Sequence, residues 1–139
     1  MKHHLLVDAA GVPLGCRVSP ANAHDVTGLL PTLVACPRPG FLADPGRTPG
    51  ELYGDRAYDS AGHEGVVGWL GVTPVIAQQG QPHGSGLGTR RYVVEQTVAA
   101  VHQNRRLKVR YEKRADIHQA FLTLACIKVC CNRLFPDAK

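Results

Sequence analysis

Apolar and polar positions alternate in two short runs near the start of the chain, at residues 4–9 and 14–19. A turn-forming segment that contains Gly11 and Pro13 separates them, so the pattern predicts a β-hairpin. Beyond the hairpin, apolar positions with helical spacing predict a helix over residues 26–35. Asp25 directly precedes this helix and is expected to cap it.

Shorter elements of both kinds follow. Residues 37–50 hold four prolines and three glycines and are expected to form a loop. A strand over 51–53, a helix from about 59 to 70 and a strand over 72–77 come next. Residues 78–88 contain four glycines and no charged side chain, which predicts a second, mobile loop.

The last third of the chain is helical in pattern. A helix is predicted over residues 89–102, with Val94, Val98 and Val101 forming its apolar stripe. A final helix, capped by Asp116 and ended by Pro136, has an expected core face of Ile117, Phe121, Leu124, Ile127, Cys131 and Leu134. The order of elements predicts one mixed α/β layer structure. We expect a domain over residues 1–135 and a short tail over 136–139.

Charge is unevenly distributed along the 139 residues. The chain carries a net charge of +5, while residues 89–115 alone hold eight Lys and Arg against Glu95 and Glu112. A local positive excess of this kind favours a polyanion such as DNA. A solvated amphipathic surface also has this composition. The basic positions considered for nucleic-acid binding are Arg105, Arg106, Lys108, Arg110, Lys113 and Arg114.

The five cysteines are odd in number and follow no secretory signal, so we expect reduced thiols in a cytoplasmic protein. Cys126, Cys130 and Cys131, with His118 nearby, lack the paired spacing of a zinc site. Burial in a helix interface is the favoured interpretation. No apolar run reaches the roughly 20 residues that a bilayer span requires, so a soluble protein without membrane contact is expected.

Two carboxylates are candidates for chemistry. Asp55 follows a predicted strand at the carboxyl edge of a sheet, where α/β folds place ligand sites, but an Asx-turn would explain it equally well. Glu95 lies four residues after Arg91 on one helix. The pair fits a metal ligand with an orienting arginine, and it also fits a plain surface ion pair, which this spacing alone favours. Tyr58 and Asp59 are interpreted as helix-start residues.

The segments together resemble bacterial insertion-sequence transposases of the DDE type. The resemblance rests on residues 2–8 with 11–14, on 20–25, on 52–59 around Asp55, on 91–95 around Glu95, and on 105–114 with 120–125. It covers nearly the whole chain, and the segments stand in the family's order. Some relatives have a tyrosine and a lysine where this chain has Gly88 and His102.

This resemblance implies a ribonuclease H-like fold with a mixed sheet flanked by helices. It also implies that Asp55 and Glu95 hold Mg²⁺ (or Mn²⁺), with one ion activating a water or 3′-hydroxyl and another stabilising the leaving oxygen. Arg91 corresponds to the arginine of the glutamate-helix motif. The family's first catalytic aspartate lies on a strand upstream of Lys2, and Asp8 does not match it, so the resemblance implies a domain shortened by about one strand.

The expected function is therefore that of a transposase fragment that acts on DNA, inactive unless an upstream segment completes it. The upstream half of a split transposase, or another copy of the chain, is the expected protein partner. Two alternatives stay open: a non-catalytic DNA-binding or regulatory product, and a decayed remnant that folds poorly because a sheet edge is exposed.

Overall fold

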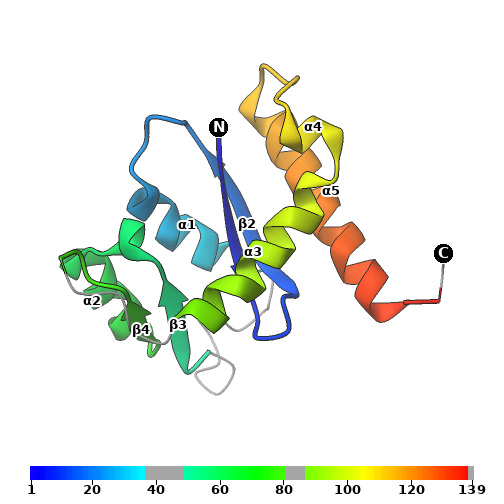
Figure 1. Ribbon diagram of the computed structural model, residues 1–139. Helices are drawn as coiled ribbons and strands as arrows, with labels where there is room; N and C mark the ends of the chain where they lie inside the picture. The colour runs from blue at the N-terminus through cyan, green and yellow to red at the C-terminus, as the bar shows by residue number, and fades with distance from the viewer. Residues whose placement is uncertain (37–48, 81–86, 138–139) are drawn as a thin grey trace.

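The computed structural model describes residues 1–36, 49–80 and 87–137, and Figure 1 shows the arrangement of the elements. These described residues include four strands: β1 (Lys2–Val7), β2 (Pro13–Ser19), β3 (Glu51–Gly54) and β4 (Thr73–Ile76). The α-helices are α1 (Leu29–Val34), α2 (Ala61–Trp69), α3 (Gly88–His102), α4 (Arg105–Lys108) and α5 (Ala115–Leu134). The 3-10 helices η1 (Asp25–Gly28) and η3 (Arg56–Tyr58) lead into α1 and α2. The mixed α/β class is confirmed.

The strands form two separate pairs. β1 and β2 are antiparallel, with Lys2 opposite Ser19 and Leu5 opposite Cys16. β3 and β4 are parallel, and they are joined through α2. The expected single mixed sheet is therefore not observed among the described residues, because β1 and β3 are not hydrogen-bonded to each other.

Successive side chains of β1 point to opposite faces of the hairpin and enter two different cores. Leu5 packs against the cluster formed mainly by α3, α4 and α5, which includes Val101, Leu107 and Leu122. Leu6 packs against the second cluster, which consists of Leu33, Leu52, Val67 and Val72. β1 thus lies between the helical end of the molecule and the β3–β4 end.

The start of the first helix differs from the expectation. Asp25 does not cap it, since His24 occupies the N-cap position of η1 and makes no side-chain capping bond. Asp25 instead forms an ion pair with Lys2, with 2.7 Å between its Oδ1 and Nζ. The helix therefore begins as a tight 3-10 turn that is held to the first residues of β1.

The buried face of α5 is not the predicted one. His118, Leu122, Ala125, Cys126 and Val129 are buried, whereas most of the predicted core positions are exposed, namely Ile117, Leu124, Ile127, Cys131 and Leu134. The helix carries apolar residues on two faces, so the spacing rule selected the wrong one. Cys126 is buried as expected, but Cys131 is exposed. Asp116 does not cap the helix, because Arg114 is the N-cap residue.

Candidate active site

Asp55 lies at the carboxyl end of β3, where the strand turns into η3. Its Oδ1 accepts a hydrogen bond from the backbone N–H of Ala57 at 3.0 Å, so the side chain caps this 3-10 helix. The predicted Asx-type role is thus present. This hydrogen bond occupies one carboxylate oxygen of Asp55, and the half-exposed carboxylate can accept further hydrogen bonds.

The predicted partners Arg91 and Glu95 lie on α3. Arg91 Nη2 is 3.7 Å from Glu95 Oε1, and both side chains are mostly exposed. An exposed pair of this spacing contributes at most about 0.5 kcal/mol to stability. The pair therefore does little to hold the fold.

One groove brings these three side chains together. A cavity of about 240 Å³ is lined by Asp55 from the β3 end, by Arg91 and Glu95 from α3, and by His3 and His4 from β1. The structure therefore brings the two candidate carboxylates and Arg91 to one groove. Among the described residues no group of three or more His, Cys, Asp or Glu side chains is arranged to hold a metal ion.

The groove continues between β1 and β3. A second cavity of about 370 Å³ is lined by residues 7–9 at the end of β1 and by Glu51 at the start of β3. The first cavity is lined by the start of β1 and the end of β3, so the two strands run in opposite directions. Apolar side chains line the groove along its length, among them Leu5, Leu6, Leu29, Leu33, Leu52, Val94 and Val98.

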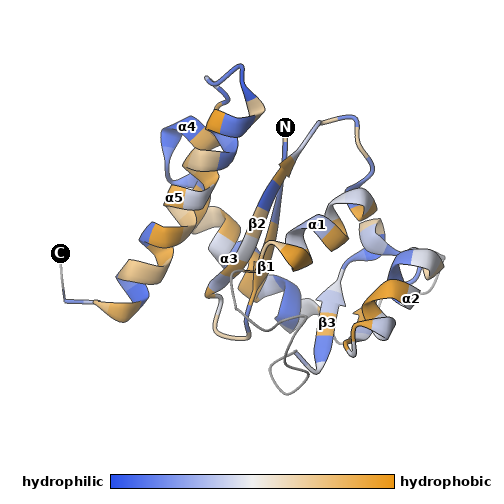
Figure 2. Cartoon of the chain, turned by 180° about the vertical axis from the view of Figure 1, so that it is seen from behind, coloured by the Kyte–Doolittle hydropathy of each residue, from blue (hydrophilic) through white to orange (hydrophobic). Residues whose placement is uncertain are grey.

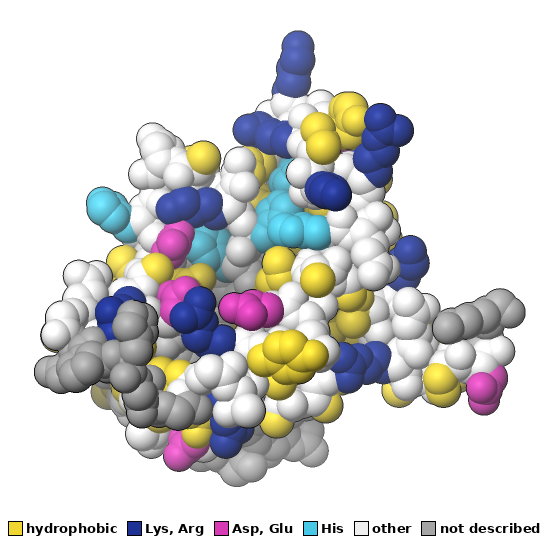
Figure 3. Space-filling view, viewed as in Figure 1, with side chains coloured by type: hydrophobic (Ala, Val, Ile, Leu, Met, Phe, Trp, Pro, Cys, Tyr) yellow, Lys and Arg dark blue, Asp and Glu magenta, His cyan; other side chains and the backbone are white. Residues whose placement is uncertain are grey.

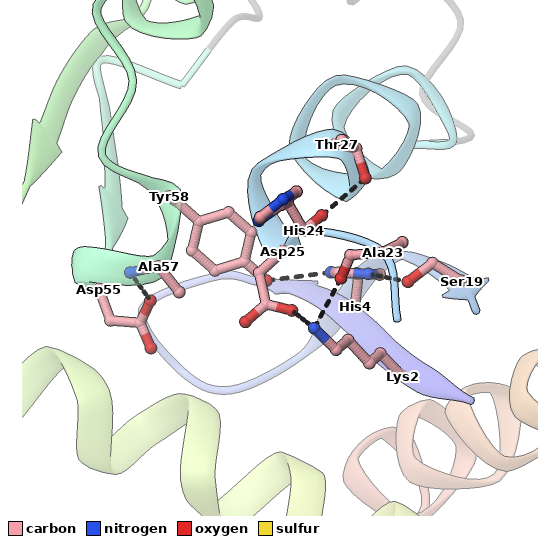
Figure 4. Close-up of polar contacts among 10 residues, drawn as sticks. All are labelled: Lys2, His4, Ser19, Ala23, His24, Asp25, Thr27, Asp55, Ala57 and Tyr58. Carbon is pink, nitrogen blue, oxygen red and sulfur yellow. Dashed lines mark hydrogen bonds and ion pairs between the residues drawn. The ribbon is translucent and has the colours of Figure 1, made fainter. Parts of the chain in front are cut away.

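A polar network that sequence reasoning missed lies at the Asp55 end of this groove (Figure 4). His4 Nδ1 is 3.0 Å from the Tyr58 hydroxyl, and His4 Nε2 is 2.7 Å from Ser19 Oγ. Burial, with the charges of Asp55 and Asp25, raises the pKa of Tyr58 to about 12, so its hydroxyl stays protonated at neutral pH. Tyr58 is thus more than a helix-start residue.

A glycine allows this network to form. A Cβ atom placed on Gly28 would lie 2.5 Å from the ring of His4. The imidazole is nearly fully buried against the η1 backbone. His4, Gly28 and Tyr58 are far apart in the sequence, so no local sequence pattern indicates that they meet.

The basic segment 105–114 lies around α4 and the start of α5, on the other side of the hairpin from β3 (Figure 1), where Figure 3 shows several Lys and Arg side chains. Arg106 forms an ion pair with Glu112 at 2.6 Å. Arg110 donates to the carbonyls of Glu112 and Lys113, and Arg114 binds Asp116. These three arginines therefore shape the turn into α5, and all six predicted basic side chains remain exposed.

Comparison with known proteins identifies the family. The sequence model of the family "Transposase DDE domain" matches residues 1–130. The chain belongs to the DDE transposase family. It is also 48% identical over 134 residues to a protein assigned as the transposase for insertion sequence element IS402 of Burkholderia cepacia. That match covers 96% of this chain and 64% of the relative, so the chain spans just under two thirds of the relative's length.

No solved structure matches this DDE transposase chain. Within its described residues, no helix is both long enough and apolar enough to span a bilayer.

In this DDE transposase chain, a cluster of three histidines lies where β1 meets the end of α3 and the start of α5. His3 Nδ1 is 2.9 Å from His102 Nε2, and His3 Nε2 is 2.7 Å from His118 Nε2. His118 is almost fully buried, and its Nδ1 has no hydrogen-bond partner among the described residues. Burial, and then the neighbouring His102 and His118, lower the pKa of His3 from 6.5 to about 4.

This cluster predicts an acid-sensitive stability. Between pH 6.5 and about 4, His3 takes up a proton in the unfolded chain but not in the folded one. Stability is therefore expected to fall as the pH drops through this range. With allowance for solvent screening of a half-exposed ring, we expect a loss of about 1–2 kcal/mol from His3. Urea unfolding of the wild type and of His3→Gln at pH 7 and pH 4 measures it.

A smaller loss between the two pH values is expected for His3→Gln than for the wild type. Equal losses in both proteins would contradict the assignment of the effect to His3.

Proposed function

We propose that this chain is the major part of a transposase catalytic domain with a ribonuclease H-like core, and that it takes part in metal-dependent cleavage and strand transfer at the ends of an insertion element. The observation that carries the proposal is the convergence of Asp55, Arg91 and Glu95 on one groove. These residues come from β3 and α3, which are far apart in sequence. The family membership supports the same interpretation.

The donor set fits a hard divalent cation. Carboxylate oxygens are the ligands that Mg²⁺ and Mn²⁺ favour, and Asp55 and Glu95 each present them to the groove. Mg²⁺ supplies Lewis-acid activation of the attacking oxygen and stabilisation of the leaving oxygen when it is bound. Asp55 and Glu95 would hold it. Arg91 would orient Glu95 through their ion pair or contact a phosphate.

We also propose that the groove between β1 and β3 is completed by a strand from the part of the transposase that this chain does not cover. Among the residues that the structure describes, β1 pairs on one side only, and so does β3. Unpaired N–H and C=O groups of facing strand edges are best satisfied by the backbone of an extended segment. The apolar groove walls favour apolar side chains on that strand. An acidic residue at its Asp55 end would supply a third carboxylate.

The test compares two proteins on labelled DNA that carries insertion-element ends, with Mg²⁺ present. One is the 139-residue chain, and the other is this chain joined to the uncovered part of the Burkholderia cepacia relative, placed upstream. We expect cleavage by the fusion and little or none by the chain alone. Robust turnover by the chain alone would overturn the requirement for completion. A well-folded fusion that does not cleave would overturn the catalytic assignment.

The exposed basic segment favours a second candidate function, a non-catalytic DNA-binding or regulatory product. Such a role needs positive charge and no metal site. It predicts that DNA binding survives Asp55→Asn and Glu95→Gln. Loss of binding in both variants would count against this role.

DNA binding is expected to depend on Lys108 and Lys113. Both lie in the exposed basic segment, and neither makes an ion pair with any residue that the structure describes. Each phosphate contact contributes about one unit to the slope of log affinity against log salt. We therefore expect Lys108→Ala with Lys113→Ala to weaken DNA binding and to reduce that slope by about two. Fluorescence anisotropy across a salt series measures it.

The control is Lys128→Ala, an exposed lysine on α5 outside the basic segment. A reduction of the slope by about one in this single-lysine variant would show that the effect is one of net charge alone.

A further inference from the structure

The outward face of α5 carries a regular apolar stripe. Leu124 is 59% exposed, Ile127 51% and Leu134 72%, while Ile117 is 37% exposed. Ala120 and Cys131 are exposed on the same helix. Figure 2 shows apolar positions recurring along α5 up to its last turn, which projects away from the strands. Large apolar side chains concentrated on one exposed helix face mark an interaction surface.

The spacing of the stripe is that of a coiled-coil seam. Apolar residues at alternating intervals of three and four keep one side of a helix facing a partner helix. The series Ile117, Ala120, Leu124, Ile127, Cys131 and Leu134 follows this rule at every step. We call these six residues the α5 seam. The opposite face of α5, with Leu122, Ala125 and Val129, packs in the chain's own core.

A second copy of this chain matches the seam by size when the two helices run antiparallel. Pairing about the midpoint between residues 125 and 126 places Ile117 opposite Leu134 and Leu124 opposite Ile127. The two small positions, Ala120 and Cys131, then face each other. Each layer therefore joins side chains of similar volume, which packs without voids.

Charge selects the same orientation. The exposed basic segment 105–114 directly precedes α5. A parallel pair of helices would bring both basic segments to one end, where like charges repel each other. An antiparallel pair places them at opposite ends, and it also aligns the helix dipoles favourably.

We propose that the α5 seam is a self-association surface through which two copies of this chain pair with antiparallel α5 helices. The interface is isologous, since each seam contacts its own counterpart about a two-fold axis. The groove with Asp55 and Glu95 is formed by β1, β3 and α3 and lies away from α5 (Figure 1). Pairing therefore leaves both candidate sites open.

Sedimentation velocity of the 139-residue chain at increasing concentration tests the proposal. We expect a dimer whose formation is favoured by moderate salt, which screens the repulsion between two positively charged copies. Leu124→Glu with Ile127→Glu buries like charges in the central layers and should raise the dissociation constant at least about 100-fold. Circular dichroism verifies that the variant is folded.

The matched control is Val66→Glu with Trp69→Glu, which changes exposed apolar residues of α2 and should leave the dimer intact. Orientation is tested with Ala120→Cys under mild oxidation, followed by mass spectrometry of the cross-linked peptides. A disulfide between the introduced cysteine and Cys131 of the second copy is expected. A monomer at every concentration, a dimer that persists in Leu124→Glu with Ile127→Glu, or cross-linking of Cys131 only to its own counterpart would overturn the proposal.

Discussion

Asp55→Asn and Glu95→Gln are each expected to reduce DNA cleavage by the completed transposase at least about 100-fold. Each substitution keeps the shape of the side chain but removes a negative charge that would hold a divalent cation. Loss of a few kcal/mol of transition-state stabilisation has this effect on a rate. Cleavage of end-labelled DNA by the fusion protein in Mg²⁺ measures it.

The structure offers matched controls for both variants. Asp116→Asn changes an exposed aspartate that is paired with Arg114, and Glu64→Gln changes a glutamate in the first turn of α2. Neither residue lines the groove. We expect cleavage close to the wild-type rate from both controls. Activity of Asp55→Asn or Glu95→Gln at the control level would refute the assignment of these carboxylates.

Leu122→Ala is expected to destabilise the chain by about 2–5 kcal/mol, because it leaves a cavity in a fully buried part of the core. Leu122 packs in the cluster that joins α5 to Val101 and Leu107. A loss of this size is a large fraction of the stability of a typical domain, about 5–15 kcal/mol. Urea denaturation of the wild type and the variant measures it.

Leu124→Ala is the control, two residues further along the same helix but 59% exposed. In dilute protein, where α5 is unpaired, we expect it to change the free energy of unfolding by no more than about 0.5 kcal/mol. Similar losses in both variants would contradict the observed orientation of α5. A cooperative transition in the wild type would also argue against a poorly folded remnant.

The fold was predictable from the sequence where one pattern dominates locally. The hairpin, the strand before Asp55 and the helix that carries Glu95 are all present, with ends shifted by one or a few residues. The buried face of α5 was not predictable by spacing, because two of its faces are apolar and only packing against β2 and α3 selects one. The separation of the strands into two pairs also depends on contacts between distant segments.

The charged residues of the candidate site could be predicted from the sequence, but the residues that surround them could not. Asp55, Arg91 and Glu95 were selected by the resemblance to the family, and the structure brings them to one groove. The role of His4 was missed, because it depends on Tyr58, Ser19 and the missing side chain of Gly28. None of these contacts leaves a periodic signal in the sequence.

The edges of β1 and β3 that are unpaired within the described part of the chain affect how the protein is best produced. In a chain synthesised with an upstream strand, that strand leaves the ribosome first and can pair with β1 and β3 as they emerge. In a chain synthesised without that strand, the same edges can contact the edges of other copies before the strand is available. This favours strand pairing between molecules. Co-expression with the proposed upstream segment should therefore yield more soluble protein than mixing the two parts after purification.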